Sequence, residues 1–210
     1  MKYRYIAYDI DGTLLDSAPA DAAGLQVALR RELGRDTPLK AICDTLGLPG
    51  RDILVALDVP EADFARVTRT WQAEKHARAG WMRLFPSVEK MLDGLRARGA
   101  HLGVVTSKRP ESYARDMAPF ALDGYFDLCI TCADTLLHKP HPEPLLKFLE
   151  RAGVGPSEAL YVGDSVYDRD CARAAGVDFA LAAWGSARPE MENVTWRLNA
   201  PEDLLAIFDT

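Results

Sequence analysis

The chain has 210 residues, enough for one large domain or for a core with a small insert, and 48% of them are hydrophobic, as in ordinary globular proteins. The net charge of −6, with no basic run longer than two residues, argues against general binding of nucleic acid. No stretch approaches the ~20 apolar residues of a membrane helix and no signal-peptide layout opens the chain, so we expect a cytoplasmic protein with no membrane partner.

The chain opens with a short apolar run, residues 3–8, that ends at two carboxylates, Asp9 and Asp11, and at Gly12. The run is typical of a buried strand, and on a strand Asp9 and Asp11 start out on the same side. Unpaired buried acids cost roughly several kcal/mol each unless a cation or hydrogen-bond donors compensate them. A divalent metal is the simplest compensation, and oxygen ligands favour magnesium.

A calcium-binding EF-hand loop also begins with Asp-x-Asp. It requires a further oxygen ligand at its fifth position, glycine at its sixth and glutamate at its twelfth. This chain has Thr13, Leu14 and Ala20 at those positions, which argues against a calcium loop.

Residues 17–84 show helical patterns and no convincing strand. An N-cap at residues 16–17 and an early proline begin a helix that should end near Gly34. A second amphipathic helix at 39–46 is followed by a glycine- and proline-containing break. Further helical segments are expected at 52–57 and 64–79.

From residue 86 onward the pattern changes to strand–helix alternation. We expect helices at 86–99, 110–117, 144–152, 168–175 and 202–208, and strands at 101–106, 126–131, 159–163 and, as the last strand, 177–183. Such alternation predicts an α/β fold in which helices cover both faces of a parallel sheet.

Ligands of such sheets bind beyond the carboxyl ends of the strands. The first strand ends at Asp9 and Asp11, the second at residues 106–108 (Thr-Ser-Lys), and the one at 159–163 is followed by Asp164 and Ser165. Three strands therefore deliver carboxylates, hydroxyls and a glycine turn to one edge of the sheet.

Four segments resemble the motifs of the haloacid dehalogenase (HAD) superfamily: 9–14 (DIDGTL), 104–107 (VVTS), 138–144 (HKPHPEP) and 162–168 (VGDSVYD). The resemblance covers nearly the whole chain and has the motifs in the right order. It implies a Rossmann-like core of residues 1–16 and 85–210. It also implies that residues 17–84 form a small all-helical cap inserted after the first strand, of a length similar to that of the phosphoglycolate-phosphatase-like branch.

By this resemblance Asp9 is the nucleophile that forms an aspartyl-phosphate. Lys139 supplies positive charge to the phosphoryl oxygens and to Asp9. Thr106, Ser107 and the backbone N–H groups of the Gly12 turn are expected to bind the phosphate.

The resemblance further implies a bound Mg²⁺, with Asp9, the Asp11 carbonyl and Asp164 as ligands. Asp168, with Ser165, is expected to act behind these ligands and to orient Lys139 or a metal-bound water. Asp11 is implied as the general acid–base, protonating the leaving oxygen and later taking a proton from water.

Structural alternatives stand beside these roles. Thr106 could cap the next turn, Lys139 could be a solvated lysine before a helix, and Asp168 could be a helix N-cap. In the helical segment Arg51 is a candidate for substrate contact, although an ordinary surface arginine is the favoured interpretation. For three residues close to the motifs we likewise favour an ordinary role: Lys108, Asp134 and His138.

The four cysteines include a C-x-x-C at Cys129 and Cys132. A zinc site would need a second ligand pair, and a redox pair would need a helix N-terminus. Residues 126–131 instead resemble a strand, so we expect reduced structural cysteines.

The sequence thus predicts a magnesium-dependent phosphatase that hydrolyses a small phosphate monoester or pyrophosphate. Asp11 argues against a dehalogenase, since hydrolytic dehalogenases of the superfamily lack a second aspartate there. A sugar-phosphate mutase of the beta-phosphoglucomutase type and a non-catalytic phosphate- or metal-binding regulator remain as alternatives. The expected partner is a small phosphorylated metabolite, and the chain is expected to be a monomer or a small homo-oligomer.

Overall fold

A computed structural model describes residues 2–208, and it divides the chain into two compact units. The first comprises the described parts of Met1–Leu14 and Leu84–Thr210, and the second is Leu15–Arg83. We call them the sheet unit and the helical unit. Within the described residues, none of the helices has the length and apolar character required to span a membrane.

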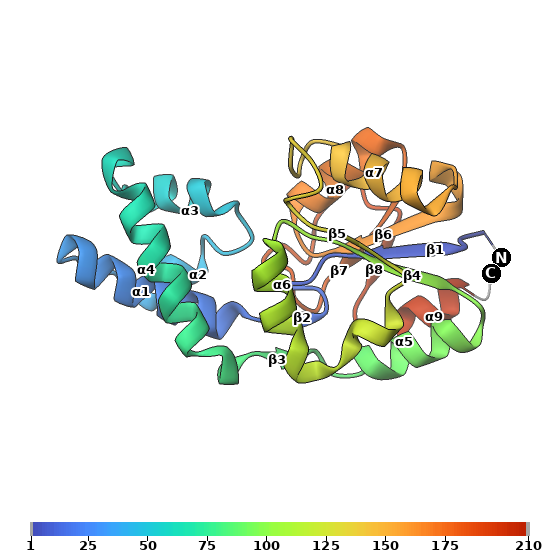
Figure 1. Ribbon diagram of the computed structural model, residues 1–210, viewed down its shortest axis with the longest axis horizontal. Coiled ribbons are helices and arrows are strands. Elements are labelled where there is room, and N and C mark those ends of the chain that lie inside the picture. The colour runs from blue at the N-terminus through green and yellow to red at the C-terminus, as the bar shows by residue number, and fades with distance from the viewer. Residues whose placement is uncertain (1, 209–210) are drawn as a thin grey trace. The chain divides into compact units, whose positions relative to one another are not determined.

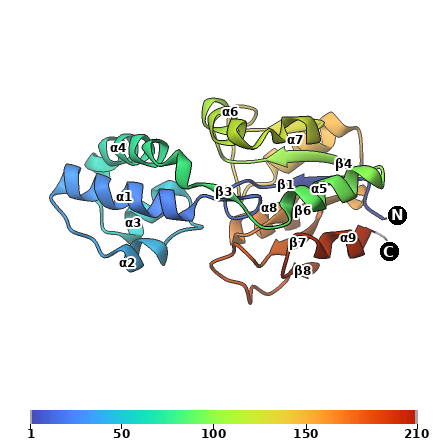
Figure 2. The same cartoon turned by 90° about the horizontal axis from the view of Figure 1, so that it is seen from below.

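The sheet unit is built on a six-stranded sheet in which every neighbouring pair is parallel. The strand order is β5-β4-β1-β6-β7-β8, and Figure 2 shows β4, β1, β6, β7 and β8 in succession. The strands are β1 (Tyr5–Tyr8), β4 (His101–Val105), β5 (Leu128–Ile130), β6 (Ala159–Gly163), β7 (Asp178–Ala182) and β8 (Trp196–Leu198).

Helices cover both faces of this sheet, as the sequence predicts: α7 and α8 lie on one face, and α5 and α9 on the other (Figure 1). The α/β, Rossmann-like fold class is therefore confirmed. The helices of the unit are α5 (Val88–Ala97), α6 (Pro110–Met117), α7 (Glu143–Ala152), α8 (Val166–Ala175) and α9 (Asp203–Phe208).

Successive side chains of β1 point to opposite faces of the sheet and contact different helices. Ala7 belongs to the core cluster with Phe148 of α7 and Cys171 of α8, whereas the Tyr8 hydroxyl lies 4.0 Å from the Met91 sulfur of α5. The strand is therefore buried on both faces, as expected for a central strand of a parallel sheet. On β4, Gly103 is required by packing, because a Cβ there would collide with the Phe148 ring.

The helical unit contains α1 (Ala18–Leu33), α2 (Leu39–Cys43), α3 (Gly50–Ala56) and α4 (Phe64–Ala77). Helices α1 and α4 pack closely, since a Cβ on Gly24 would meet the Lys75 backbone nitrogen at 2.8 Å. Lys75 also pairs with Asp21 at 2.5 Å, and the Trp71 indole N–H donates to the Asp21 carbonyl at 3.1 Å. Apolar side chains of all four helices form its core.

Three short strands were not expected. Two-residue strands β2 (Leu15–Asp16) and β3 (Arg83–Leu84) pair with each other, and β8 follows the strand that was expected to be last. Each is too short to show an alternating pattern, because such patterns need four or more residues. In addition, β8 lies at the edge of the sheet and, within residues 2–208, pairs with β7 alone.

Candidate active site

The register of the sheet aligns the ends of three strands. Tyr8 of β1 pairs with Val104 of β4 and with Val162 of β6, so the residues that follow these three lie at one edge. Asp9 continues β1 by donating its N–H to the Val162 carbonyl at 2.9 Å. Asp9, Thr106 and Asp164 therefore leave their strands at nearly the same level, as the sequence predicts.

The turn after Asp9 is held against Asp164. Gly12 has a φ of 76°, and a Cβ there would collide with the Asp164 carboxylate, so glycine is required on both grounds. The Thr13 hydroxyl donates to Asp164 Oδ1 at 3.2 Å. The close approach fixes Asp164, which follows β6, against the segment after β1 that carries Asp9 and Asp11.

A loop after β7 supports the same turn and was missed in the sequence. The Trp184 indole N–H donates to the Thr13 carbonyl at 2.9 Å, and a Cβ on Gly185 would collide with the Gly12 carbonyl. The Ser186 hydroxyl donates to the Asp164 carbonyl at 2.5 Å. Position alone could have indicated this loop, because it directly follows a strand of the same parallel sheet.

Lys139 joins Asp9 to Asp168. Its Nζ lies 3.0 Å from Asp9 Oδ1 and 2.7 Å from Asp168 Oδ1, and its side chain is only 7% exposed. Burial alone lowers the pKa of Lys139, but the attraction of the two carboxylates outweighs it and the pKa is raised. A solvated lysine is therefore wrong for this position, and the ammonium stays charged beside Asp9.

Asp168 is fully buried and uses both carboxylate oxygens. Oδ1 accepts from Lys139, and Oδ2 accepts from the Ser165 N–H at 3.0 Å and the Ser165 hydroxyl at 2.5 Å. Ser165 is the N-cap of α8 and Asp168 its third residue, so the alternative of Asp168 as the N-cap is wrong. Burial raises the pKa of Asp168, but Lys139 foremost, with the hydroxyls of Ser165 and Tyr161, outweighs burial and lowers it.

Tyr161 of β6 is a further member of this group that sequence reasoning missed. Its hydroxyl lies 2.9 Å from both the Val105 carbonyl and Asp168 Oδ1, and Lys139 Nζ donates to it at 3.1 Å. A tyrosine inside an apolar strand gives no sign of this contact, because buried aromatic residues are ordinary there.

Three carboxylates in this region lie close enough together that they could hold a metal ion. One oxygen each of Asp9, Asp164 and Asp168 lies within 4.8 Å of the others. Against the single positive charge of Lys139, the three ionised acids leave two negative charges. Burial, followed by the field of neighbouring carboxylates, raises the pKa of Asp164 well above its usual range. The pKa of Asp9 rises to about 6, because burial and the nearby acids outweigh Lys139.

A hard divalent cation fits this surplus of negative charge and these oxygen donors. Because both oxygens of Asp168 already accept hydrogen bonds, Asp9 and Asp164 are better placed than Asp168 to be ligands. The same hydrogen bonds suit Asp168 to orienting Lys139.

Lys108 differs from the expectation of an ordinary surface lysine. Its side chain is 8% exposed, and its Nζ lies 2.8 Å from Asp11 Oδ2 and 2.8 Å from Asp116 Oδ2. Burial lowers the pKa of Lys108, but the two carboxylates outweigh it and raise the pKa. The second acid of the first strand therefore also has a lysine partner.

The remaining candidates lie as follows. Thr106 is buried and its hydroxyl oxygen accepts the Lys108 N–H at 3.3 Å, so it does cap the turn, and its O–H remains a donor. Ser107 is exposed. Asp134 pairs with Arg151 at 2.7 Å and accepts from the Thr131 N–H, a structural role as expected. Arg51, in the helical unit, is exposed and pairs with Glu61 at 2.6 Å.

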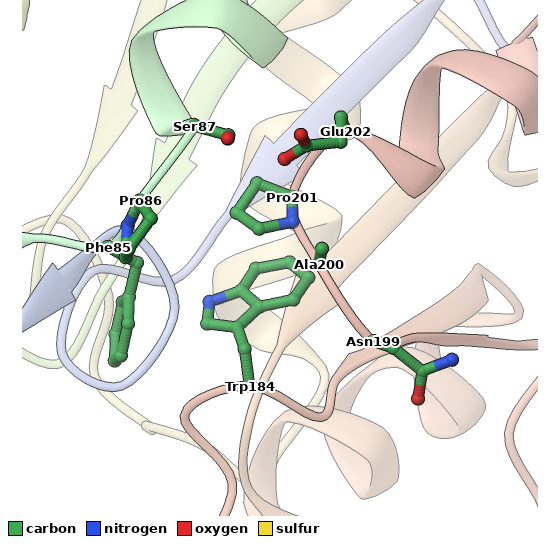
Figure 3. A pocket seen from close by; sticks show the side chains of 8 residues that line it. All are labelled: Phe85, Pro86, Ser87, Trp184, Asn199, Ala200, Pro201 and Glu202. Carbon is green, nitrogen blue, oxygen red and sulfur yellow. The ribbon is translucent and has the colours of Figure 1, made fainter.

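The sheet unit also contains a cavity of about 300 Å³ beside Trp184 (Figure 3). Phe85 and Trp184 line it, and both hydrogen-bond to the turn after Asp9: Trp184 to the Thr13 carbonyl and the Phe85 N–H to the Leu14 carbonyl at 3.1 Å. The cavity contains none of the predicted site residues. Its lining is Phe85, Pro86, Ser87, Trp184, Asn199, Ala200, Pro201 and Glu202.

Known proteins are similar to this chain in sequence and in fold. Residues 6–182 match the family model described as haloacid dehalogenase-like hydrolase. The chain is 36% identical over 201 residues to phosphoglycolate phosphatase from Xylella fastidiosa, covering 92% of this chain and 86% of that protein. It is 32% identical to PpaX, a proposed pyrophosphatase from Caldanaerobacter subterraneus, covering 88% and 83%. A crystal structure of a proposed phosphoglycolate phosphatase from Lactobacillus plantarum superposes with a TM-score of 0.92 at 30% identity, covering 99% of this chain and 100% of that one.

Proposed function

We propose, on the premise that this chain belongs to the haloacid dehalogenase-like hydrolase family and is a HAD phosphatase, that it hydrolyses a small phosphate monoester or pyrophosphate through an aspartyl-phosphate on Asp9. The observation that carries the proposal is the position of the Asp9 carboxylate. It is buried, it touches Lys139, and it shares a cluster with Asp164. A carboxylate in this setting can attack a phosphoryl group whose negative charge the neighbouring cations offset.

In the first step the Asp9 oxygen forms a bond to phosphorus and the ester P–O bond breaks. Asp11 gives its proton to the leaving oxygen, so that an alcohol departs from a monoester and phosphate departs from pyrophosphate. Lys139 offsets charge on the phosphoryl oxygens, while Thr106 and the N–H groups of the Gly12 turn donate hydrogen bonds to them. Lys139 thereby lowers the repulsion between Asp9 and the incoming dianion.

In the second step water attacks phosphorus and the bond to the Asp9 oxygen breaks, which releases inorganic phosphate. Asp11 takes the proton from that water and returns to its starting state. Mg²⁺ held by Asp9 and Asp164 would act as a Lewis acid on the phosphoryl oxygens. Asp168 holds Lys139 in place through both steps, supported by Ser165 and Tyr161.

The relatives indicate the class of substrate. Those compared above are named phosphoglycolate phosphatase and, in one case, pyrophosphatase, and we propose a substrate of that size and charge for this chain. Because the core chemistry is common to such substrates, we assign their selection to the helical unit. Arg51 is a candidate contact there, with an ordinary surface arginine as the favoured interpretation.

The test is a hydrolysis screen over phosphoglycolate, pyrophosphate, a nucleoside monophosphate and a sugar phosphate, with and without magnesium. We expect magnesium-dependent release of phosphate from at least one of them. Asp9→Asn keeps the size of the side chain and removes the nucleophile, so it should lose nearly all turnover while its circular dichroism spectrum is unchanged. Undiminished turnover in that variant would refute the role of Asp9.

A further inference from the structure

The backbone of Lys108 is fixed from two sides. Its N–H donates to the Thr106 hydroxyl oxygen at 3.3 Å, and its carbonyl accepts from the Cys132 N–H at 3.0 Å. Thr106 follows β4 and Cys132 follows β5, so the ends of two neighbouring strands hold this residue. The Lys108 backbone is therefore held in place at the ends of β4 and β5.

The Lys108 ammonium is fixed at its other end by Asp116 of α6. Asp116 Oδ2 lies 2.8 Å from Lys108 Nζ, and Asp116 Oδ1 accepts from Arg115 Nε at 3.1 Å. The Asp116 side chain is 2% exposed, so this carboxylate is an internal anchor and not a surface charge. Each of its oxygens has one cationic partner.

Asp11 is the second carboxylate that pairs with the Lys108 ammonium. When Asp11 is ionised, Asp116 and Asp11 carry two negative charges and Lys108 and Arg115 carry two positive ones, so the group is then neutral as a whole. Asp11 Oδ2 lies 2.8 Å from Lys108 Nζ, and the Asp11 side chain is 34% exposed, whereas those of Lys108 and Asp116 are 8% and 2% exposed. The buried acid is thus on the protein side of Lys108 and the accessible acid on the solvent side.

We propose that Lys108, anchored by Asp116, is a positioning residue that holds the Asp11 carboxylate in place for proton transfer to the leaving group. The inference rests on the proposed function, since it assigns a support to the acid–base of that reaction. The competing explanation is that Lys108 only compensates the buried charge of Asp116. The two explanations differ in what happens when Lys108 and the charge of Asp116 are removed together.

The experiment compares two esters of equal charge at saturating magnesium, ethyl phosphate and p-nitrophenyl phosphate. Ethanol is a far weaker acid than p-nitrophenol, so its departure depends much more on a proton from Asp11. The ratio kcat/KM reports on binding and the step that expels the alcohol, and it leaves out hydrolysis of the phosphoenzyme. Neither ester has a second anionic group that Lys108 could bind.

We expect Lys108→Met to lower kcat/KM for ethyl phosphate at least about tenfold more than for p-nitrophenyl phosphate. The double variant Lys108→Met/Asp116→Asn removes the buried charge that Lys108 compensates, so it should recover stability in thermal unfolding but keep the same selective loss. Lys147→Met is the matched control, because Lys147 pairs with Glu150 on the surface of α7 at 2.9 Å. This control should leave kcat/KM unchanged for both esters.

Equal losses for both esters in Lys108→Met would overturn the inference. So would a double variant with the wild-type kcat/KM for ethyl phosphate, because Lys108 would then only compensate Asp116. Failure of the proposed function has a different signature: wild-type protein would hydrolyse neither ester, or Asp9→Asn would hydrolyse both as well as wild type does.

Discussion

Two groups of the sheet unit have the same arrangement: a lysine lies between a more exposed aspartate and a buried one. In the Lys139 group the outer acid is Asp9 and the buried acid is Asp168. In the Lys108 group they are Asp11 and Asp116. In each group the buried acid fixes the lysine, and the lysine in turn fixes an acid of the first strand.

The two groups differ in net charge. With all acids ionised, the Lys139 group together with Asp164 has two negative charges in excess, whereas the Lys108 group is neutral once Arg115 is included. The first is therefore suited to a divalent cation and the second is not. The charges around them suit Asp9 and Asp11, neighbouring acids of one turn, to the different roles proposed for them. Five predictions test these proposals, in order of decreasing effect.

Lys139→Met should have the largest effect. It removes the cation from Asp9 and leaves Asp168 buried without it, so kcat/KM should fall about 1000-fold for ethyl and p-nitrophenyl phosphate alike. The free energy of unfolding should fall by about 3–5 kcal/mol. Steady-state kinetics and urea unfolding measure the two effects, with Lys147→Met as the control. A loss of kcat/KM confined to ethyl phosphate would contradict this prediction, because Lys139 would then have the same effect as Lys108.

Asp164→Asn should reduce magnesium affinity by at least about 100-fold, since it removes a proposed ligand. Wild-type protein should melt at a higher temperature when magnesium is added, because the ion binds only the folded state. The variant should lose most of that shift, measured by thermal unfolding over a magnesium titration. Asp44→Asn is a control, because Asp44 pairs with Lys40 on the surface of the helical unit. An unchanged magnesium response in Asp164→Asn would refute the metal assignment.

The pH dependence of magnesium binding should follow the pKa of Asp9. That pKa is raised to about 6, so the proton stabilises the metal-free fold below the unfolded-state value of roughly 4, and this stabilisation is lost as pH rises through 6. Magnesium competes with the proton, so the ion should stabilise the protein more at pH 7 than at pH 5. The difference should be about 1.4 kcal/mol per pH unit below 6 for this one group. Equal melting shifts at both pH values would contradict it.

Tyr161→Phe should have a smaller effect, confined to the Lys139 group. It removes the single O–H donor that lies 2.9 Å from both the Val105 carbonyl and Asp168 Oδ1, which should destabilise the fold by about 1–3 kcal/mol. Turnover should fall severalfold and equally for the two esters. A selective loss of ethyl phosphate hydrolysis would place Tyr161 with the proton transfer instead.

Arg51→Ala should have the smallest effect. Arg51 is exposed and its pair with Glu61 lies in the helical unit, so the stability should change by less than about 1 kcal/mol. We expect KM for phosphoglycolate to stay within about twofold of wild type, as for an ordinary surface arginine. A rise in KM for phosphoglycolate, but not for ethyl phosphate, would instead identify Arg51 as a substrate contact.

The sequence predicts the Lys139 group better than the Lys108 group for a physical reason. Asp9, Lys139 and Asp168 each lie in a recognisable motif at a strand end or a helix start. Asp116 lies within a helix whose other charged residues, Glu111 and Arg115, are exposed, and its own burial depends on how α6 packs in the fold. Helical periodicity does not distinguish a buried carboxylate from an exposed one.

The fold shows the same division. Apolar runs predict the central strands, and helical spacing predicts the helices on both faces. Two of these elements, β6 (Ala159–Gly163) and α6 (Pro110–Met117), begin and end at the expected residues. Strands of two or three residues, such as β8, depend on pairing with a neighbour and leave no periodic signal. The contacts of Tyr161 and of the 184–186 loop likewise depend on which elements the fold brings together.

The central claim is that the Asp9 carboxylate becomes covalently phosphorylated, and trapping it is the most direct measurement. Borohydride added during turnover of p-nitrophenyl phosphate reduces an aspartyl-phosphate to homoserine, which peptide mass spectrometry locates in the chain. We expect homoserine at position 9, dependent on magnesium and greatly diminished in Lys139→Met. Homoserine at another aspartate, or none at all while p-nitrophenol is being released, would contradict it.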